Sequence, residues 1–145
     1  MLAAMDHHAH TRAGQGVRLG LGCLVLASVS GCSDIAWQPS LSAAQQQAAR
    51  DGRVVLVYYW SLFNRDCKDM DRTVFRNQDV IETLAGTLPV RLDATFHRSW
   101  ARRSGVRRIP AFAVYGPDGQ LLNLREGPLN EGQFRAFVIS AKLSR

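Results

Sequence analysis

The chain has 145 residues, of which 46% are hydrophobic and 21% charged, and a formal net charge of +6 at pH 7. This length leaves room for one domain with a real hydrophobic core, and we find no internal repeat or low-complexity tract in the sequence. The cysteines and histidines form no cluster with metal-ligand spacing, which excludes a structural zinc site. We expect neither a metal nor a cofactor.

The N-terminal residues 1–31 have the features of an export signal. Two arginines supply a positive flank, and residues 19–29 form an apolar stretch that is too short to span a bilayer stably. Val-Ser-Gly-Cys at residues 29–32 resembles the lipobox of bacterial lipoproteins, which implies cleavage before Cys32 and lipid on its sulfur. The alternatives are an ordinary signal peptide and an uncleaved anchor. We therefore predict an exported chain, anchored through Cys32 on the periplasmic side of the outer membrane.

Export restricts the cysteine chemistry. Cys23 departs with the signal peptide and Cys32 carries lipid, so Cys67 is left as the single free thiol. An exported domain with one thiol forms no internal disulfide. Residues 32–40 have no clear periodicity and are predicted to be a lipid-anchored tether, which leaves residues 41–145 as the folded domain.

Helical and strand patterns alternate along this domain. The β-branched and aromatic run at residues 54–60 is typical of a strand covered on both faces. Gly-Pro-Asp-Gly at residues 116–119 predicts a hairpin turn, and Asn130 with Gln133 resembles a capping box that opens a final helix. The order predicts an α/β domain, with a central mixed sheet flanked by helices on both faces. We expect helices at 41–50, 67–75, 78–85, 96–104 and 130–143, and strands at 54–60, 89–94, 111–115 and 120–124.

The strand at residues 54–60 leads into a loop that ends in Cys67 and Lys68. This layout resembles the active-site segment of the thioredoxin superfamily, in which a strand is followed by Trp-Cys-x-x-Cys-Lys. Phe63 falls on the tryptophan of that motif and Asn64 on its first cysteine. The two spacer residues are Arg65 and Asp66, and Cys67 falls on the second cysteine. The resemblance therefore implies a degenerate motif that lacks the attacking thiol.

A second segment supports the same resemblance. Gly-Val-Arg-Arg-Ile-Pro-Ala-Phe at residues 105–112 is similar to the thioredoxin segment Gly-Val-x-x-Ile-Pro-Thr-Phe. The resemblance implies that Pro110 is cis and faces the active-site loop, and that Ile109 offers backbone hydrogen bonds to an extended substrate. The alternative is a trans proline that opens an edge strand. The resemblance covers residues 41–143 and looks nearest to the C-terminal periplasmic domain of membrane thiol:disulfide reductases and to exported thioredoxin-like lipoproteins.

The changes in the motif alter its chemistry. Disulfide reduction needs an attacking thiolate and a second thiol that resolves the mixed disulfide, and Asn64 has no sulfur. Asparagine is instead a favoured helix N-cap, so its side chain is expected to bond the N–H of Cys67 and to stabilise the helix by about 1 kcal/mol. The family usually places a buried acid where this chain has Tyr58, and a tyrosine cannot relay protons near neutral pH.

Cys67 admits two interpretations. In one, its sulfur lies beneath the loop and behaves as a small hydrophobe. In the other, it is a partly exposed monothiol that the helix end, Arg65 and Lys68 activate, while Asp66 opposes the activation.

Three functions follow from these alternatives. The first is an envelope lipoprotein that binds polypeptide partners in a groove formed by Phe63, Ile109 and Pro110, without disulfide reductase turnover. The second is a monothiol oxidoreductase that uses Cys67. The third is a structural subunit held by its lipid next to a membrane redox partner.

A basic cluster leads into this groove. It is either a solvated face or a positive rim that favours an acidic partner or anionic lipid head groups. Nucleic acid is not expected as a partner, because the chain is exported and no aromatic residues are interleaved with the basic ones. The cluster consists of Arg98, Arg102, Arg103, Arg107 and Arg108.

Overall fold

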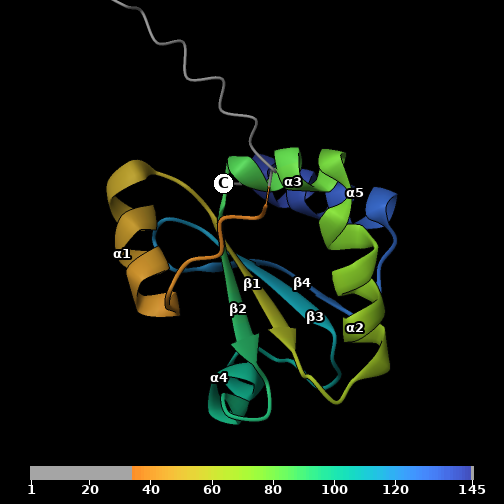
Figure 1. Cartoon of the computed structure of the whole chain (residues 1–145). Coiled ribbons are helices and arrows are strands. Elements are labelled where there is room, and N and C mark those ends of the chain that lie inside the picture. The colour runs from red at the N-terminus through yellow and green to blue at the C-terminus, as the bar shows by residue number, and fades with distance from the viewer. Residues whose placement is uncertain (1–33, 145) are drawn as a thin grey trace, which may run out of the picture. The chain divides into compact units, whose positions relative to one another are not determined.

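A four-stranded mixed sheet forms the centre of residues 34–144, the part of the chain that this computed structural model describes (Figure 1). The strand order is β2-β1-β3-β4, with β1 parallel to β2 and antiparallel to β3, and with β3 antiparallel to β4. The predicted α/β architecture is confirmed. The strands are β1 (Val55–Trp60), β2 (Leu88–Asp93), β3 (Ala111–Tyr115) and β4 (Leu121–Glu126). The predicted signal peptide and the lipidation site at Cys32 lie outside the described residues.

Strand β1 is buried on both faces. Successive side chains of a strand point to opposite sides, so Leu56 and Tyr58 join one core while Val55 and Val57 join the other. This explains why the sequence of β1 is continuously apolar rather than alternating.

The helices divide between the two faces of the sheet, as Figure 1 shows. One face is covered by α1 (Leu41–Asp51) and α4 (Arg98–Arg103). The other is covered by α2 (Arg65–Arg72), the short 3-10 helix η1 (Val74–Arg76), α3 (Gln78–Ala85) and α5 (Glu131–Leu143). The capping box predicted at Asn130 and Gln133 is present at the start of α5.

Some element boundaries differ from those predicted. Helix α2 begins at Arg65, two residues before the predicted start, because the side chain of Asn64 caps it. Helix α4 begins at Arg98 rather than at 96, since the carboxylate of Asp93 accepts a hydrogen bond from the Thr95 N–H (2.7 Å) and holds the preceding residues in a turn. Strand β4 extends to Glu126 because that residue pairs with Ala111.

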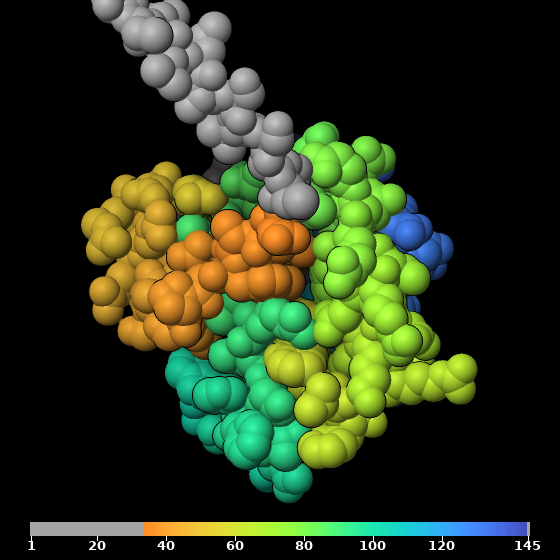
Figure 2. Space-filling view, in the orientation of Figure 1, coloured from red at the N-terminus to blue at the C-terminus, as the bar shows by residue number. Residues whose placement is uncertain are grey.

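The segment predicted as a tether packs against the domain in its described part. The Gln38 N–H donates to the Pro89 carbonyl at 2.7 Å, and the Trp37 ring meets Phe75 edge-on at 5.7 Å between centroids. Ile35 also packs against the core. The segment predicted as a lipid-anchored tether therefore docks on the domain over residues 35–38, because burial of its apolar side chains is favourable. Figure 2 shows this segment, in orange, lying across the surface between α1 and α3.

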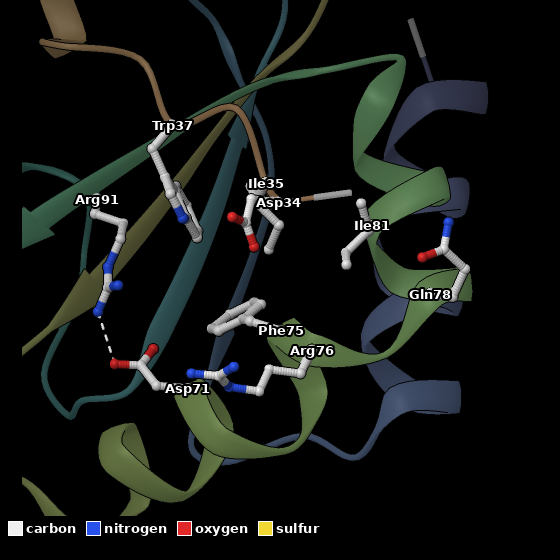
Figure 3. Close-up of a pocket in the computed structure, with 9 residues that line it drawn as sticks. All are labelled: Asp34, Ile35, Trp37, Asp71, Phe75, Arg76, Gln78, Ile81 and Arg91. Atoms are coloured by element: carbon white, nitrogen blue, oxygen red, sulfur yellow. Dashed lines mark hydrogen bonds and ion pairs between the residues drawn. The ribbon is translucent and has the colours of Figure 1, made fainter. Parts of the chain in front are cut away.

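Arg91 connects this segment to the sheet and to α2. Its guanidinium forms an ion pair with Asp71 (2.7 Å) and lies over the rings of Trp60 (4.3 Å) and Trp37 (5.4 Å). Figure 3 shows Arg91 and Asp71 at one side of the pocket that Trp37 and Phe75 help to line. Within residues 34–144, no helix is both long and apolar enough to cross a bilayer.

Candidate functional site

Asn64 is the N-cap residue of α2. Its backbone is extended (φ −91°, ψ 125°), and its side-chain Oδ1 accepts a hydrogen bond from the Cys67 N–H at 3.0 Å. The cap predicted from the sequence is therefore confirmed. Because the polar side chain satisfies a backbone donor that the helix itself cannot, the position is occupied by a structural group rather than a reactive one.

The same side chain also reaches the second predicted segment. Asn64 Nδ2 donates to the backbone carbonyl of Ile109 at 3.2 Å, and the Ile109–Pro110 peptide bond is cis. The two segments singled out in the sequence thus face each other across the site. The resemblance implies that the backbone of Ile109 forms hydrogen bonds with an extended substrate. In this structure the Ile109 carbonyl already accepts one hydrogen bond from Asn64.

The loop before Pro110 is held from strand β4. The carboxylate of Glu126 accepts hydrogen bonds from the backbone N–H groups of Arg107 and Arg108, the latter at 2.9 Å, and these two bonds lower the pKa of Glu126 below its usual value. The Gly127 N–H donates to the Pro110 carbonyl at 2.8 Å. Sequence reasoning missed Glu126, since a carboxylate that pairs with backbone 18 residues away leaves no local pattern.

The backbone conformation at position 127 favours glycine. Its φ of +88° lies in the region that favours glycine. A Cβ there would also come within 2.7 Å of the Arg108 guanidinium. The glycine after the hairpin therefore lets the Arg108 side chain lie close to the backbone that supports Pro110.

Cys67 is fully buried at the base of the site. Its carbonyl accepts a hydrogen bond from the Tyr58 hydroxyl at 3.4 Å, and the thiol is free. Burial is the main cause that raises the pKa of Cys67 above its ordinary value. Hydrogen bonding to Ser61 and Tyr58 acts against this shift, and the nearby carboxylates of Asp71 and Asp66 add to it. The thiol therefore stays protonated near neutral pH, which is the environment of an inert structural cysteine.

Tyr58 fills the position where the resemblance implies a buried acid. Its ring stacks on Phe112 with centroids 5.1 Å apart, and the residue is fully buried. Burial is the main cause that raises the pKa of Tyr58 above the ordinary value of a tyrosine. The phenol therefore stays protonated at neutral pH and serves as a packing group and hydrogen-bond donor.

Exposed apolar side chains surround the site. The exposed fraction of Phe63 is 87% and that of Leu62 is 56%, while Ile109 is half-buried and Pro110 is buried. Of the three predicted groove residues, Phe63 and Ile109 therefore offer surface, and Pro110 does not. Phe96, whose exposed fraction is 84%, follows the end of β2. Sequence reasoning missed Leu62 and Phe96, although apolar residues just after parallel strands converge on one edge of the sheet.

The basic cluster divides into two groups. Arg103 lies over the Trp100 ring at 4.5 Å, and Arg108 lies against Gly127. Arg98, Arg102 and Arg107 instead line a cavity of about 290 Å³ next to Ile109. Among residues 34–144, no group of three or more His, Cys, Asp or Glu side chains is placed to hold a metal ion.

Comparisons with known proteins agree with this geometry. No protein-family model matches the sequence, and no curated protein matches it either. Among solved structures, the chain is similar to a thioredoxin from Thermus thermophilus, with a TM-score of 0.68 and 22% identity over 76% of this chain and 88% of that one.

Two further solved structures are similar as well. DsbH oxidoreductase matches with a TM-score of 0.67 and 13% identity, over 77% of this chain and 87% of that one. The reduced C-terminal domain of DsbD from Neisseria meningitidis matches with a TM-score of 0.56 and 17% identity, over 72% and 94%. Residues 34–144 of this chain therefore have the fold of the thioredoxin superfamily.

Proposed function

We propose that this chain is a thioredoxin-like polypeptide-binding protein that does not turn over disulfides. The observation that carries this proposal is the place of Asn64. A thioredoxin-like oxidoreductase has its attacking sulfur at this position, whereas Asn64 bonds Cys67 and Ile109 through its amide.

The remaining thiol does not replace the missing one. Reduction of a disulfide proceeds through a mixed disulfide that a thiolate must first form. Cys67 is fully buried and its pKa is raised, so both access and thiolate fraction are low at neutral pH.

The surface beside Asn64 supports binding. Phe63 and Leu62 project from the loop after β1, and Ile109 borders the same site from the opposite segment. Exposed aromatic side chains of this kind anchor protein partners. We propose a polypeptide of the bacterial envelope as the partner, with the chain exported and held at the membrane by lipid on Cys32.

An insulin-reduction assay with dithiothreitol tests the absence of turnover. We expect the chain to give the uncatalysed rate, and Cys67→Ser to give the same rate. Asn64→Cys supplies the positive control, because it restores the spacing of two thiols. Catalysis by the natural chain that Cys67→Ser abolishes would overturn the proposal.

A monothiol oxidoreductase is the competing proposal. It is favoured by the position of Cys67 in the first turn of α2, where the helix end stabilises a thiolate. It requires alkylation of the folded chain at pH 7 to be at least as fast as alkylation of a free thiol. Slower alkylation eliminates it.

A further inference from the structure

The cavity next to the proposed groove has an apolar floor and a positive rim. Ala101, Val106 and Ile109 contribute the apolar surface, and Ser61 and Thr95 contribute hydroxyl groups. Among the described residues, its remaining polar lining comes from three arginines, and no carboxylate lines it. The arginines are Arg98, Arg102 and Arg107.

The charge of this rim is only partly compensated within residues 34–144, since the charges of Arg107 and Arg108 help to lower the pKa of Glu126. The ion pairs among residues 34–144 use other arginines: Arg65, Arg72, Arg91 and Arg135. Asp93, close by in sequence, accepts a hydrogen bond from the Thr95 N–H, and Glu126 accepts hydrogen bonds from the backbone of Arg107 and Arg108. Three exposed guanidinium groups therefore remain available to an anionic partner.

The loops that contribute Ser61 and Thr95 to the cavity also carry exposed aromatic rings. Phe63 and Phe96 stand on the loops that follow β1 and β2, with exposed fractions of 87% and 84%. The Ser61 and Thr95 hydroxyls of these loops lie 3.3 Å apart, which fixes the two loops side by side. Figure 2 shows them together at the lower end of the molecule, in yellow and blue-green.

We propose that the partner is an acidic polypeptide segment, whose apolar side chains contact Phe63, Phe96 and Ile109 and whose carboxylates pair with Arg98, Arg102 and Arg107. This inference rests on the proposed function and names the partner class for the same site. The cavity of about 290 Å³ shares Ile109 with the proposed polypeptide groove, and this continuity favours a peptide over a lipid surface. The positive rim then favours an acidic peptide.

Fluorescence anisotropy with labelled peptides tests this inference on the full chain in a mild detergent. The probe is a ten-residue peptide that alternates Glu with Phe and Leu, and the matched peptides carry Gln or Lys in place of Glu. We expect the Glu peptide to bind about tenfold more tightly than the Gln peptide in 50 mM salt. This preference shrinks as salt rises, because salt screens exposed charges.

Variants of the three rim arginines test whether these side chains cause the preference for Glu. Arg98→Gln, Arg102→Gln and Arg107→Gln should each weaken binding of the Glu peptide roughly twofold to fivefold, and the triple variant should lose the preference for Glu. Arg50→Gln removes an exposed charge from the end of α1 and should leave the preference unchanged. Thermal unfolding of the triple variant confirms that it still folds.

The outcomes separate the two proposals. If no peptide binds, the proposed function fails. If the Glu, Gln and Lys peptides bind equally, the groove binds polypeptide but the acidic partner is overturned. If short-chain phosphatidylglycerol binds more tightly than the Glu peptide and through the same arginines, a lipid head group replaces the peptide and the inference is overturned.

Discussion

The amide of Asn64 joins α2 to the loop before Pro110, because one side chain accepts from Cys67 and donates to the carbonyl of Ile109 at 3.2 Å. An intramolecular hydrogen bond thus connects the start of α2 to the loop that contains the cis peptide bond. The side chain at position 64 therefore contributes to the scaffold.

Removing the Asn64 side chain should destabilise the domain by more than the loss of a helix cap alone would. We expect Asn64→Ala to lower the free energy of unfolding by about 2 kcal/mol, of which about 1 kcal/mol is the cap and the rest the bond to Ile109. Urea denaturation measures the change.

Asn77 is the matched control for this prediction. It caps α3 through the Val80 N–H at 3.2 Å and is half-buried like Asn64. Within residues 34–144, its side chain makes no hydrogen bond to another loop. Asn77→Ala should therefore cost about 1 kcal/mol. Equal losses in the two variants would show that the contact with Ile109 adds nothing to stability.

The burial of Cys67 gives the domain a pH dependence. Because the pKa of this thiol is raised in the folded state, the folded chain binds its proton more tightly than the unfolded chain does. Stability should be fully present below the unfolded pKa of about 8.5 and should decline as the pH rises through the folded value.

Cys67→Ala isolates the contribution of the thiol. Urea denaturation at pH 7 and at pH 9.5 should show a smaller decline in this variant than in the natural chain. Iodoacetamide at pH 7 should react with the folded natural chain more slowly than with the denatured chain. A fast reaction, or the same decline in both proteins, contradicts a buried thiol with a raised pKa.

Restoring a sulfur at position 64 should restore redox chemistry. Asn64→Cys places two cysteines across the first turn of α2, with the spacing of the thioredoxin motif. We expect an intramolecular disulfide on oxidation, seen as the loss of two hydrogens by mass spectrometry, and measurable reduction of insulin. Lack of both would mean that the loop holds the two side chains apart.

The ion pair of Arg91 with Asp71 should matter more than one at the surface. Both side chains are about 28–29% exposed, and a second oxygen of Asp71 is buried without a hydrogen-bond partner among the described residues. Arg91→Met should therefore cost about 2 kcal/mol. Arg135→Met, which breaks the more exposed pair with Asp79 at 2.9 Å, should cost less than about 1 kcal/mol. The two denaturation midpoints decide the comparison.

Trp37 should anchor the N-terminal segment. Its ring contacts Phe75 and Tyr58, so Trp37→Ala should lower stability by about 2–3 kcal/mol. Trp100→Ala removes a ring that is 40% exposed and contacts Arg103, and should cost less than about 1 kcal/mol. If the two variants unfold alike, residues 35–38 are not docked in solution.

Much of the fold was predictable because its signals are local. The apolar run of β1 and the caps at Asn64 and Asn130 depend on neighbours within a few residues. The prediction that Pro110 faces the loop with Asn64 rested on the resemblance rather than on a local pattern. In both cases the structure agrees with the prediction.

Contacts between residues far apart in the sequence could not be predicted from local patterns. The support from Glu126, the bond from Asn64 to Ile109 and the cavity beside Arg102 all join residues far apart in sequence. The partners of Trp37, Phe75 on η1 and Tyr58 on β1, also lie far from it in the sequence.

The docking of residues 35–38 has a consequence for orientation. Gln38 bonds Pro89 at the beginning of β2, whereas Asn64 follows the end of β1, which runs parallel to β2. The first described residues thus lie at the start of the parallel strands, and the groove lies at their far end (Figure 1). These opposite ends are about 20 Å apart for the six residues of β1. A partner bound in the groove approaches the domain from the end remote from Gln38.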